Sequence, residues 1–170
     1  GSLAIIWFEN VDPIKGSDEI LLDVKNLVTQ FPMKTGLLRR TTANVHAVED
    51  VSFTLMKGRT LSLVGESGCG KSTVGRSLLR LVEPKSGAIQ INGEDVIAMD
   101  REQLREARRH MQMVFQDPFA SLDPQMALID QVAEPMRNYK THQGQDLIKR
   151  VEMLFDRVEL PRSFLRRFPH

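Results

Sequence analysis

A glycine-rich segment between an apolar stretch and an amphipathic stretch constrains this chain more than any other feature. It consists of Gly65, Glu66, Ser67, Gly68, Cys69, Gly70, Lys71, Ser72 and Thr73, and it fits the pattern G-x-x-x-x-G-K-[ST] at every fixed position. The short, apolar, β-prone residues 59–64 precede it, and residues 74–81 carry apolar side chains at helical spacing. We therefore predict a strand, a phosphate-binding loop and a helix, in that order.

A loop of this kind binds phosphate through its backbone. Successive N–H groups form a nest for an anion, and the helix that follows adds its positive N-terminal end. Gly68 and Gly70 carry no Cβ that would block the phosphates. Lys71 is predicted to reach the β- and γ-phosphates, and the Ser72 hydroxyl to bind Mg²⁺. The structural alternative is a glycine-rich turn with a surface lysine, which the flanking strand and helix disfavour.

The amino-acid composition restricts the class of protein to which this chain can belong. A length of 170 residues suffices for one domain with a core, and 41% hydrophobic and 26% charged residues are ordinary for a globular protein. The net charge of +1 gives no electrostatic case for nucleic acid. The single cysteine, Cys69, excludes an internal disulfide and is interpreted as a small side chain that fills the loop. No apolar run approaches the length of a membrane span. The pair Arg108 and Arg109 is interpreted as a solvated face or a helix end.

The chain changes from mixed α/β to all-α character near residue 120. Alternation and turn residues predict strands over 20–28, 45–55, 88–96 and 111–115, with a hairpin turn at Asn92-Gly93 and a polar, loop-like segment over 32–44. Asp100 is a predicted N-cap, with Gln103 as its capping-box partner, for a helix that ends near residue 109. Apolar faces predict two further helices over 125–140 and 146–158.

A second motif follows the last predicted strand: Phe115, Gln116, Asp117 and Pro118, continuing to Pro124. Together with the glycine-rich loop it resembles the nucleotide-binding subunits of ATP-binding cassette (ABC) transporters, most closely those of dipeptide, oligopeptide and glutathione importers. Segments 27–32 and 45–53 are similar to the second cassette of the fused two-cassette members. The resemblance covers roughly residues 20–170.

The resemblance implies a fold and a domain plan. The expected fold is an α/β P-loop NTPase cassette with an antiparallel β layer, a P-loop core sheet and the start of an α-helical subdomain. Residues 1–19 are expected to be an interdomain linker or a segment derived from cloning. Residues 20–118 would form the β layer and P-loop core, and residues 119–170 an incomplete helical subdomain.

The resemblance also implies residue roles and cofactors. Gln116 matches the glutamine that senses Mg²⁺ and the γ-phosphate and links them to the membrane subunit, so Ser72 and Gln116 form the expected metal side. Phe31 matches the aromatic that stacks on adenine, with a core aromatic after a strand as the alternative. The expected cofactors are ATP and Mg²⁺, bound by Phe31, residues 65–73 and Gln116.

The implied function is the ATP-binding component of an importer for peptides or related solutes. Its expected partners are transmembrane permease subunits, a second ATP-binding cassette and, indirectly, a solute-binding protein, at the cytoplasmic face of the membrane. The sequence stops at His170, where the family continues into its signature motif, so no catalytic residue is predicted here. We expect this stretch alone to bind nucleotide but to hydrolyse little ATP. Without later strands, residues 60–64 should lie at an exposed sheet edge, or the fold should close differently.

Two alternatives stay open at this point. In one, the chain is another P-loop protein, a kinase or a GTPase, with Asp117 as its metal-binding aspartate. Gln116 and Pro118 interrupt the apolar run that such a strand needs, and no guanine-specificity motif is present. In the other, the chain is a nucleotide-binding module without catalytic activity.

Overall fold

The structure is a computed structural model that describes residues 5–8, 18–35, 40–115, 117 and 121–169. Its contacts divide the chain into two compact units, Gly1–Gln116 and Asp117–His170.

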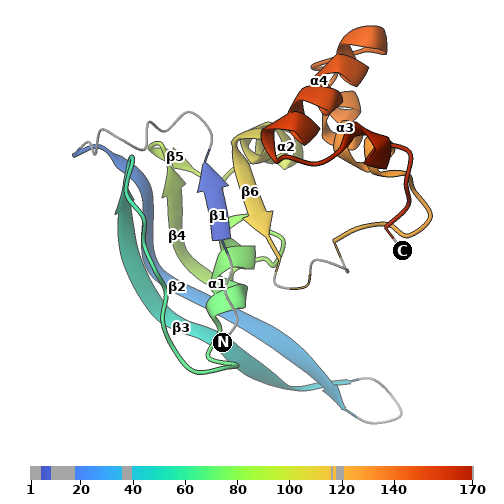
Figure 1. The fold of residues 1–170 in the computed structure, drawn as a ribbon. Coiled ribbons are helices and arrows are strands. Elements are labelled where there is room, and N and C mark those ends of the chain that lie inside the picture. Colours follow the sequence, from blue (N-terminus) through green and yellow to red (C-terminus); the bar gives the residue numbers. More distant parts are fainter. Residues whose placement is uncertain (1–4, 9–17, 36–39, 116, 118–120, 170) are drawn as a thin grey trace. The chain divides into compact units, whose positions relative to one another are not determined.

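An antiparallel sheet of four strands forms the scaffold of the first unit (Figure 1). The strand order is β3-β2-β4-β5, with β2 at Ile20–Thr35, β3 at Arg40–Met56, β4 at Ser86–Ile91 and β5 at Glu94–Asp95. The predicted antiparallel layer is thus confirmed. Asn92 and Gly93 both have positive φ, at 50° and 82°, which is the geometry that a two-residue hairpin between β4 and β5 requires.

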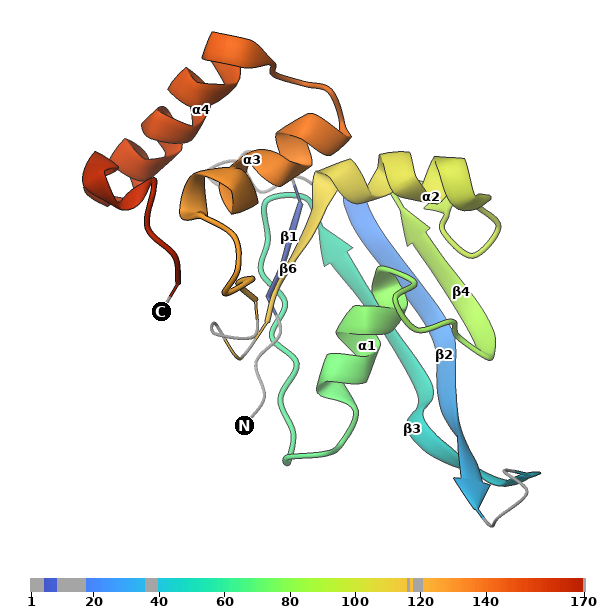
Figure 2. The same cartoon turned by 90° about the vertical axis from the view of Figure 1, so that its right-hand side faces the viewer.

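Two helices supply the apolar side chains that cover this sheet. These are α1 at Lys71–Leu78 and α2 at Arg101–Ala107, and Figure 2 shows α1 along one face of β2 and β3. The cap of α2 is as predicted, because the Asp100 side chain accepts from the N–H groups of Glu102 and Gln103 and the Gln103 side chain completes a capping box. The buried cluster contains Leu22, Val24, Leu27, Val48, Val74, Leu78, Ile89, Val96 and Leu104.

The segment over 32–44 differs from its prediction. It was expected to be a loop, but β2 continues to Thr35 and β3 begins at Arg40, so the two strands form a long hairpin arm. The backbone explains why Pro32 is tolerated there. Pro32 pairs with Asn44 of β3, while the pairing of β2 with β4 ends at Val28, so no described strand pairs with the other edge of β2 at this proline.

The strand predicted for residues 59–64 is wrong for this chain. Residues 59–66 have no regular structure, and the side chains of Leu61, Leu63 and Val64 are exposed, Val64 to 92%. A strand needs a neighbour that satisfies its N–H and C=O groups. Among the described residues none pairs with this segment, so it forms no sheet edge and its apolar side chains stay exposed.

A small second sheet completes the first unit. Strand β6 at Met111–Val114 pairs antiparallel with β1 at Ile5–Phe8, with Ile5 opposite Val114 and Phe8 opposite Met111. Strand β6 confirms the prediction for 111–115. The pairing with β1 was not predicted, because residues 1–19 were expected to be a linker or a segment derived from cloning. A short 3-10 turn, Arg108–His110, joins α2 to β6.

The second unit is helical. It contains α3 at Leu128–Asn138, α4 at Gly144–Arg157 and a 3-10 turn at Arg162–Phe164, which confirms both predicted helices with shorter bounds for α3. Ala133, Leu147, Val151, Phe155 and Leu165 form its buried cluster. In the described part of the chain, no helix is long and apolar enough to cross a membrane.

Candidate functional site

The glycine-rich loop ends at the N-terminus of α1, where the N-cap residue offers no capping side chain. Gly70 is the N-cap, in a left-handed conformation with φ 92°, and as a glycine it makes no side-chain bond to the first turn. The first turn also contains no acidic residue. The first N–H groups of a helix have no partner within it, and they carry the positive end of its dipole. This end of α1 is therefore suited to an anion.

Lys71 turns its ammonium group back into the loop. Its Nζ donates to the carbonyl oxygens of Gly65 at 2.7 Å and Glu66 at 2.5 Å, and lies 3.3 Å from Sγ of Cys69. Neutral carbonyls are weaker partners for a cation than charged oxygens. A phosphate oxygen in the loop would therefore compete well for the same ammonium group.

The three glycines of the loop are needed for different reasons. A Cβ on Gly65 would lie 2.7 Å from Sγ of Cys69, whereas a Cβ on Gly68 would meet nothing within 4 Å. A Cβ on Gly70 would overlap the Ala47 carbonyl oxygen and lie 3.1 Å from its carbon. Gly70 thus lets the start of α1 approach the backbone of β3. Gly68 leaves open space on the loop.

A buried hydrogen bond fixes α1 against β2. The hydroxyls of Thr29 and Ser77 lie 2.8 Å apart, and both side chains are fully buried. Val48, which pairs with Thr29 across the two strands, and Val74 of α1 both belong to the core cluster. No sequence signal predicts this pair, because the two residues lie 48 positions apart and neither belongs to a motif.

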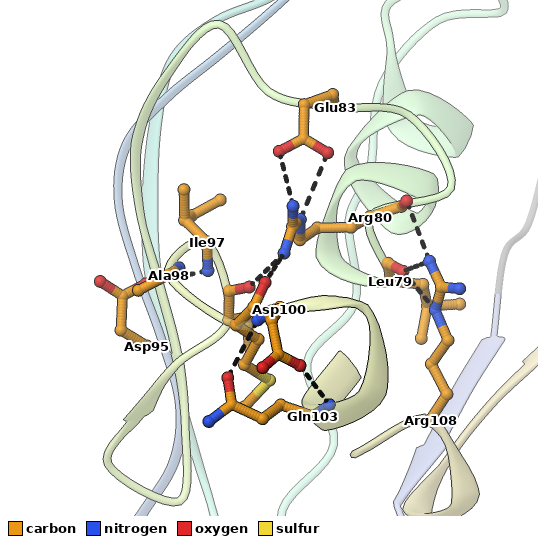
Figure 3. A network of polar contacts seen from close by, with 11 residues as sticks. Leu79, Arg80, Glu83, Asp95, Ile97, Ala98, Asp100, Gln103 and Arg108 are labelled. Carbon is orange, nitrogen blue, oxygen red and sulfur yellow. Dashed lines mark hydrogen bonds and ion pairs between the residues drawn. The ribbon is translucent and has the colours of Figure 1, made fainter. Parts of the chain in front are cut away.

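The C-terminal end of α1 is held by two arginines (Figure 3). The Arg108 guanidinium donates to the carbonyls of Leu79 and Arg80, and the Arg80 guanidinium donates to those of Val96 and Met99. Of the two interpretations of Arg108, the solvated face is wrong and the helix end is correct, because Arg108 is the C-cap of α2 and its hydrogen bonds are partly buried. Its acceptors lie 28 and 29 residues upstream, so only its place in the last turn of a predicted helix hinted at carbonyl binding.

Two of the other predicted site residues, Phe31 and Gln116, lie apart from this loop in the chain, whereas Ser72 and Thr73 belong to it. Phe31 is on β2, opposite Val45 of β3, and its side chain is 38% exposed. Gln116 lies outside the described residues. Ser72 and Thr73 are half-buried in the first turn of α1. Searching the described ranges gives no cluster of three or more histidine, cysteine, aspartate or glutamate side chains that could hold a metal ion.

Comparisons with known proteins place this geometry in a family. Residues 48–167, more than half of the chain, match the family model described as ABC transporter. The chain is 51% identical over 152 residues to the glutathione import ATP-binding protein GsiA of Escherichia coli (strain K12), covering 89% of this chain and 24% of that protein. It is 48% identical over 159 residues to GsiA of Pectobacterium atrosepticum, covering 94% and 26%. The chain therefore belongs to the ABC transporter family, and it spans about a quarter of the length of these relatives.

Solved structures agree on the fold. A dimeric post-hydrolysis state of the ATP-binding cassette MJ0796, bound to ADP and Pi, superposes with a TM-score of 0.71 at 25% identity. That match covers 88% of this chain and 62% of the other. The cbiO1 protein from Clostridium perfringens, part of the ABC transporter complex cbiONQ, gives a TM-score of 0.62 at 20% identity, covering 89% and 55%. The expected α/β cassette fold and the family resemblance are both confirmed.

Proposed function

We propose that this chain is the nucleotide-phosphate-binding part of an ATP-binding subunit of an importer for peptides or related solutes. The observation that carries the proposal is the uncapped N-terminus of α1 behind a loop whose lysine points inward. The relatives named above are import ATP-binding proteins, and one related cassette is bound to ADP and Pi. In the whole protein, ATP binding and hydrolysis would drive transport.

Each loop residue has a defined task in this proposal. The N–H groups at the start of α1 and the loop amides would donate to the phosphate oxygens, which the open space at Gly68 admits. Lys71 would exchange its two carbonyl partners for phosphate oxygens and so hold the chain of phosphates in place. Gly65, Glu66, Ser67, Cys69 and Thr73 complete the loop.

Three further contacts, to the metal ion and to the adenine ring, are part of the proposal. The Ser72 hydroxyl and the Gln116 amide are the oxygen ligands we propose for Mg²⁺, which prefers such hard donors. When bound, Mg²⁺ neutralises phosphate charge and polarises the phosphoryl group. Phe31, with its exposed ring, is the residue we propose to stack on adenine.

The same proposal covers partners and location. The whole protein would pair with a second ATP-binding cassette and dock on transmembrane permease subunits, at the cytoplasmic face of the membrane as a peripheral subunit. A solute-binding protein would contribute indirectly. The import function of the relatives supports this assembly.

Titration of the chain with a fluorescent ATP analogue in the presence of Mg²⁺ tests the proposal. We expect saturable binding that unlabelled ATP displaces. Lys71→Ala should weaken binding about ten- to a hundredfold, because it removes charge-assisted bonds worth about 1.5–3 kcal/mol. The matched control is Lys85→Ala, which removes an exposed lysine after α1 with the same change in charge and should leave affinity unchanged.

Two results would contradict the proposal. If Lys71→Ala and Lys85→Ala bind the analogue as well as the unchanged chain does, the loop is not the phosphate site. If GTP displaces the analogue far better than ATP, the site belongs to a different class of nucleotide-binding protein.

A further inference from the structure

The C-terminal end of α1 contains an arginine where helices usually place glycine. Arg80 has φ 47°, its N–H donates to Ser77 O at 3.0 Å, and the N–H of Leu81 donates to Arg76 O at 2.9 Å. This pair of bonds is the Schellman motif, whose left-handed residue is usually glycine. The motif satisfies two of the last carbonyls of the helix. The carbonyls of Leu79 and Arg80 need partners from elsewhere.

Arg108 supplies those partners (Figure 3). Its Nε and Nη2 donate to Leu79 O at 2.9 and 2.7 Å, and Nη2 also donates to Arg80 O at 2.9 Å. A planar fork with a permanent charge fits two adjacent carbonyls better than a flexible ammonium does. The positive charge also lies at the negative end of the α1 dipole. Arg108 is therefore both a cap and a cross-link.

The position of Arg108 in the chain means that this cross-link connects α1 to β6. Arg108 begins the 3-10 turn that leads without a gap into β6, whose first residue, Met111, is buried. Strand β6 ends at Val114, two residues before Gln116 in the sequence. The helix between the loop and the cross-link is only eight residues, about 12 Å long at 1.5 Å per residue. A displacement of the loop therefore has only about two helical turns to cross before it reaches the cross-link.

Arg80 adds hydrogen bonds from the end of α1 to the segment that precedes α2. Its Nη1 donates to Val96 O at 3.1 Å and to Met99 O at 2.7 Å, directly before the Asp100 cap of α2. Glu83 holds the same guanidinium through Nε at 3.2 Å and Nη2 at 3.1 Å. The end of α1 is thus bonded to the segments on both sides of α2. The C-terminal end of α1 therefore joins this helix to the segment before α2 and to the turn that leads into β6.

We infer that Arg108 is a positioning residue that makes α1 and β6 move together, so that a ligand bound at the loop before α1 changes the backbone of β6. The inference rests on the proposed function, since it takes nucleotide phosphate as that ligand. Arg108 touches no phosphate in this scheme. It acts through the carbonyls of Leu79 and Arg80.

Amide hydrogen exchange on the whole chain, with and without Mg²⁺ and ATP, tests the inference. In the unchanged chain, ATP should slow exchange over 65–73 and also change exchange over 111–115 by about twofold or more, a difference in local opening that exchange resolves. Arg108→Lys keeps the charge but loses the fork, and Arg108→Gln loses both. Both variants should keep the response at 65–73 and lose the response at 111–115.

Arg109→Gln is the matched control. It removes the same charge one position further on, from a guanidinium that donates to the exposed Glu106 at 2.6 Å on the same helical segment. This variant should keep both responses. Should Arg108→Gln fail to fold, Arg108→Lys decides.

The outcomes separate this inference from the proposed function. No response at 65–73 in the unchanged chain would refute the proposed function. A response at 65–73 without one at 111–115 would overturn the inference alone. The inference also fails if the Arg108 variants respond at both segments, or if they lose both responses together, since Arg108 would then build the site rather than connect it to β6.

Discussion

The replacement of Gly70 by alanine is the sharpest test of how the loop is attached to the sheet. Gly70 has φ 92° and ψ 3°, a conformation that costs an L-residue about 1–2 kcal/mol. Its Cβ would also overlap the Ala47 carbonyl oxygen and lie 3.4 Å from Cγ2 of Val48, so the start of α1 must move away from β3. Forcing extra atoms into a packed site costs about 1–3 kcal/mol. We expect Gly70→Ala to lower the free energy of unfolding by about 2–5 kcal/mol.

Gly68→Ala is the matched control, because it shares the strain but not the contact. Gly68 has φ 83°, and a Cβ there meets nothing within 4 Å. We expect it to cost only the conformational term, about 1–2 kcal/mol. Urea titration followed by the fluorescence of Trp7, the single tryptophan, reports on the first unit through β1. Equal losses for the two variants would show that the Ala47 carbonyl is not what requires glycine at position 70.

Three further predictions concern single contacts. Thr29→Val should cost about 1–3 kcal/mol by leaving the buried Ser77 hydroxyl unpaired. The double variant with Thr29→Val and Ser77→Ala should lose less free energy of unfolding than the two single variants lose in sum. A double-mutant cycle in urea in which the losses simply add would show that the two hydroxyls do not interact. Asp100→Ala should lower stability by about 0.5–2 kcal/mol through loss of the α2 cap, whereas Asp100→Ser should retain most of it; equal losses in thermal melts followed by circular dichroism would contradict the cap. Hydrogen bonds from Arg162 hold the pKa of Asp156 below its ordinary value of 3.8. The unfolded state therefore binds more protons near that pH, and the Asp156 contribution should be complete above it and vanish as pH falls through the lowered pKa of the folded state. Asp156→Asn should flatten this part of a pH series of urea titrations, and an unchanged series would refute the link.

Local signals in the sequence predicted the elements that depend on local interactions. The Asp100 capping box and the Asn92-Gly93 turn are short-range arrangements of backbone and side chain, and both are present as expected. The helices α3 and α4 followed from the spacing of apolar residues. In each case the residues that decide the structure lie within a few positions of one another.

Predictions failed where the outcome depends on a distant neighbour. Residues 59–64 have the composition of a strand, but a strand forms only beside a partner, and the sequence of the segment does not specify one. The pairing of β1 with β6 joins segments about a hundred positions apart. Arg108 is the equivalent case in the candidate site, since its carbonyl acceptors belong to another element. The helix after the loop was predictable, but its attachment to the rest of the fold was not.

The two ends of α1 show how this attachment serves the loop. At the C-terminal end, the Schellman bonds and the Arg108 cation satisfy the last carbonyls and oppose the negative end of the dipole. At the N-terminal end, the N-cap residue Gly70 has no side chain to cap the helix, and the first turn carries no acidic residue. The bonds at the C-terminal end hold the helix in place. The N–H groups at the N-terminal end can therefore remain without protein partners while the helix does not fray. The same asymmetry leaves the positive potential of α1 concentrated on the glycine-rich loop, where a phosphate would meet it.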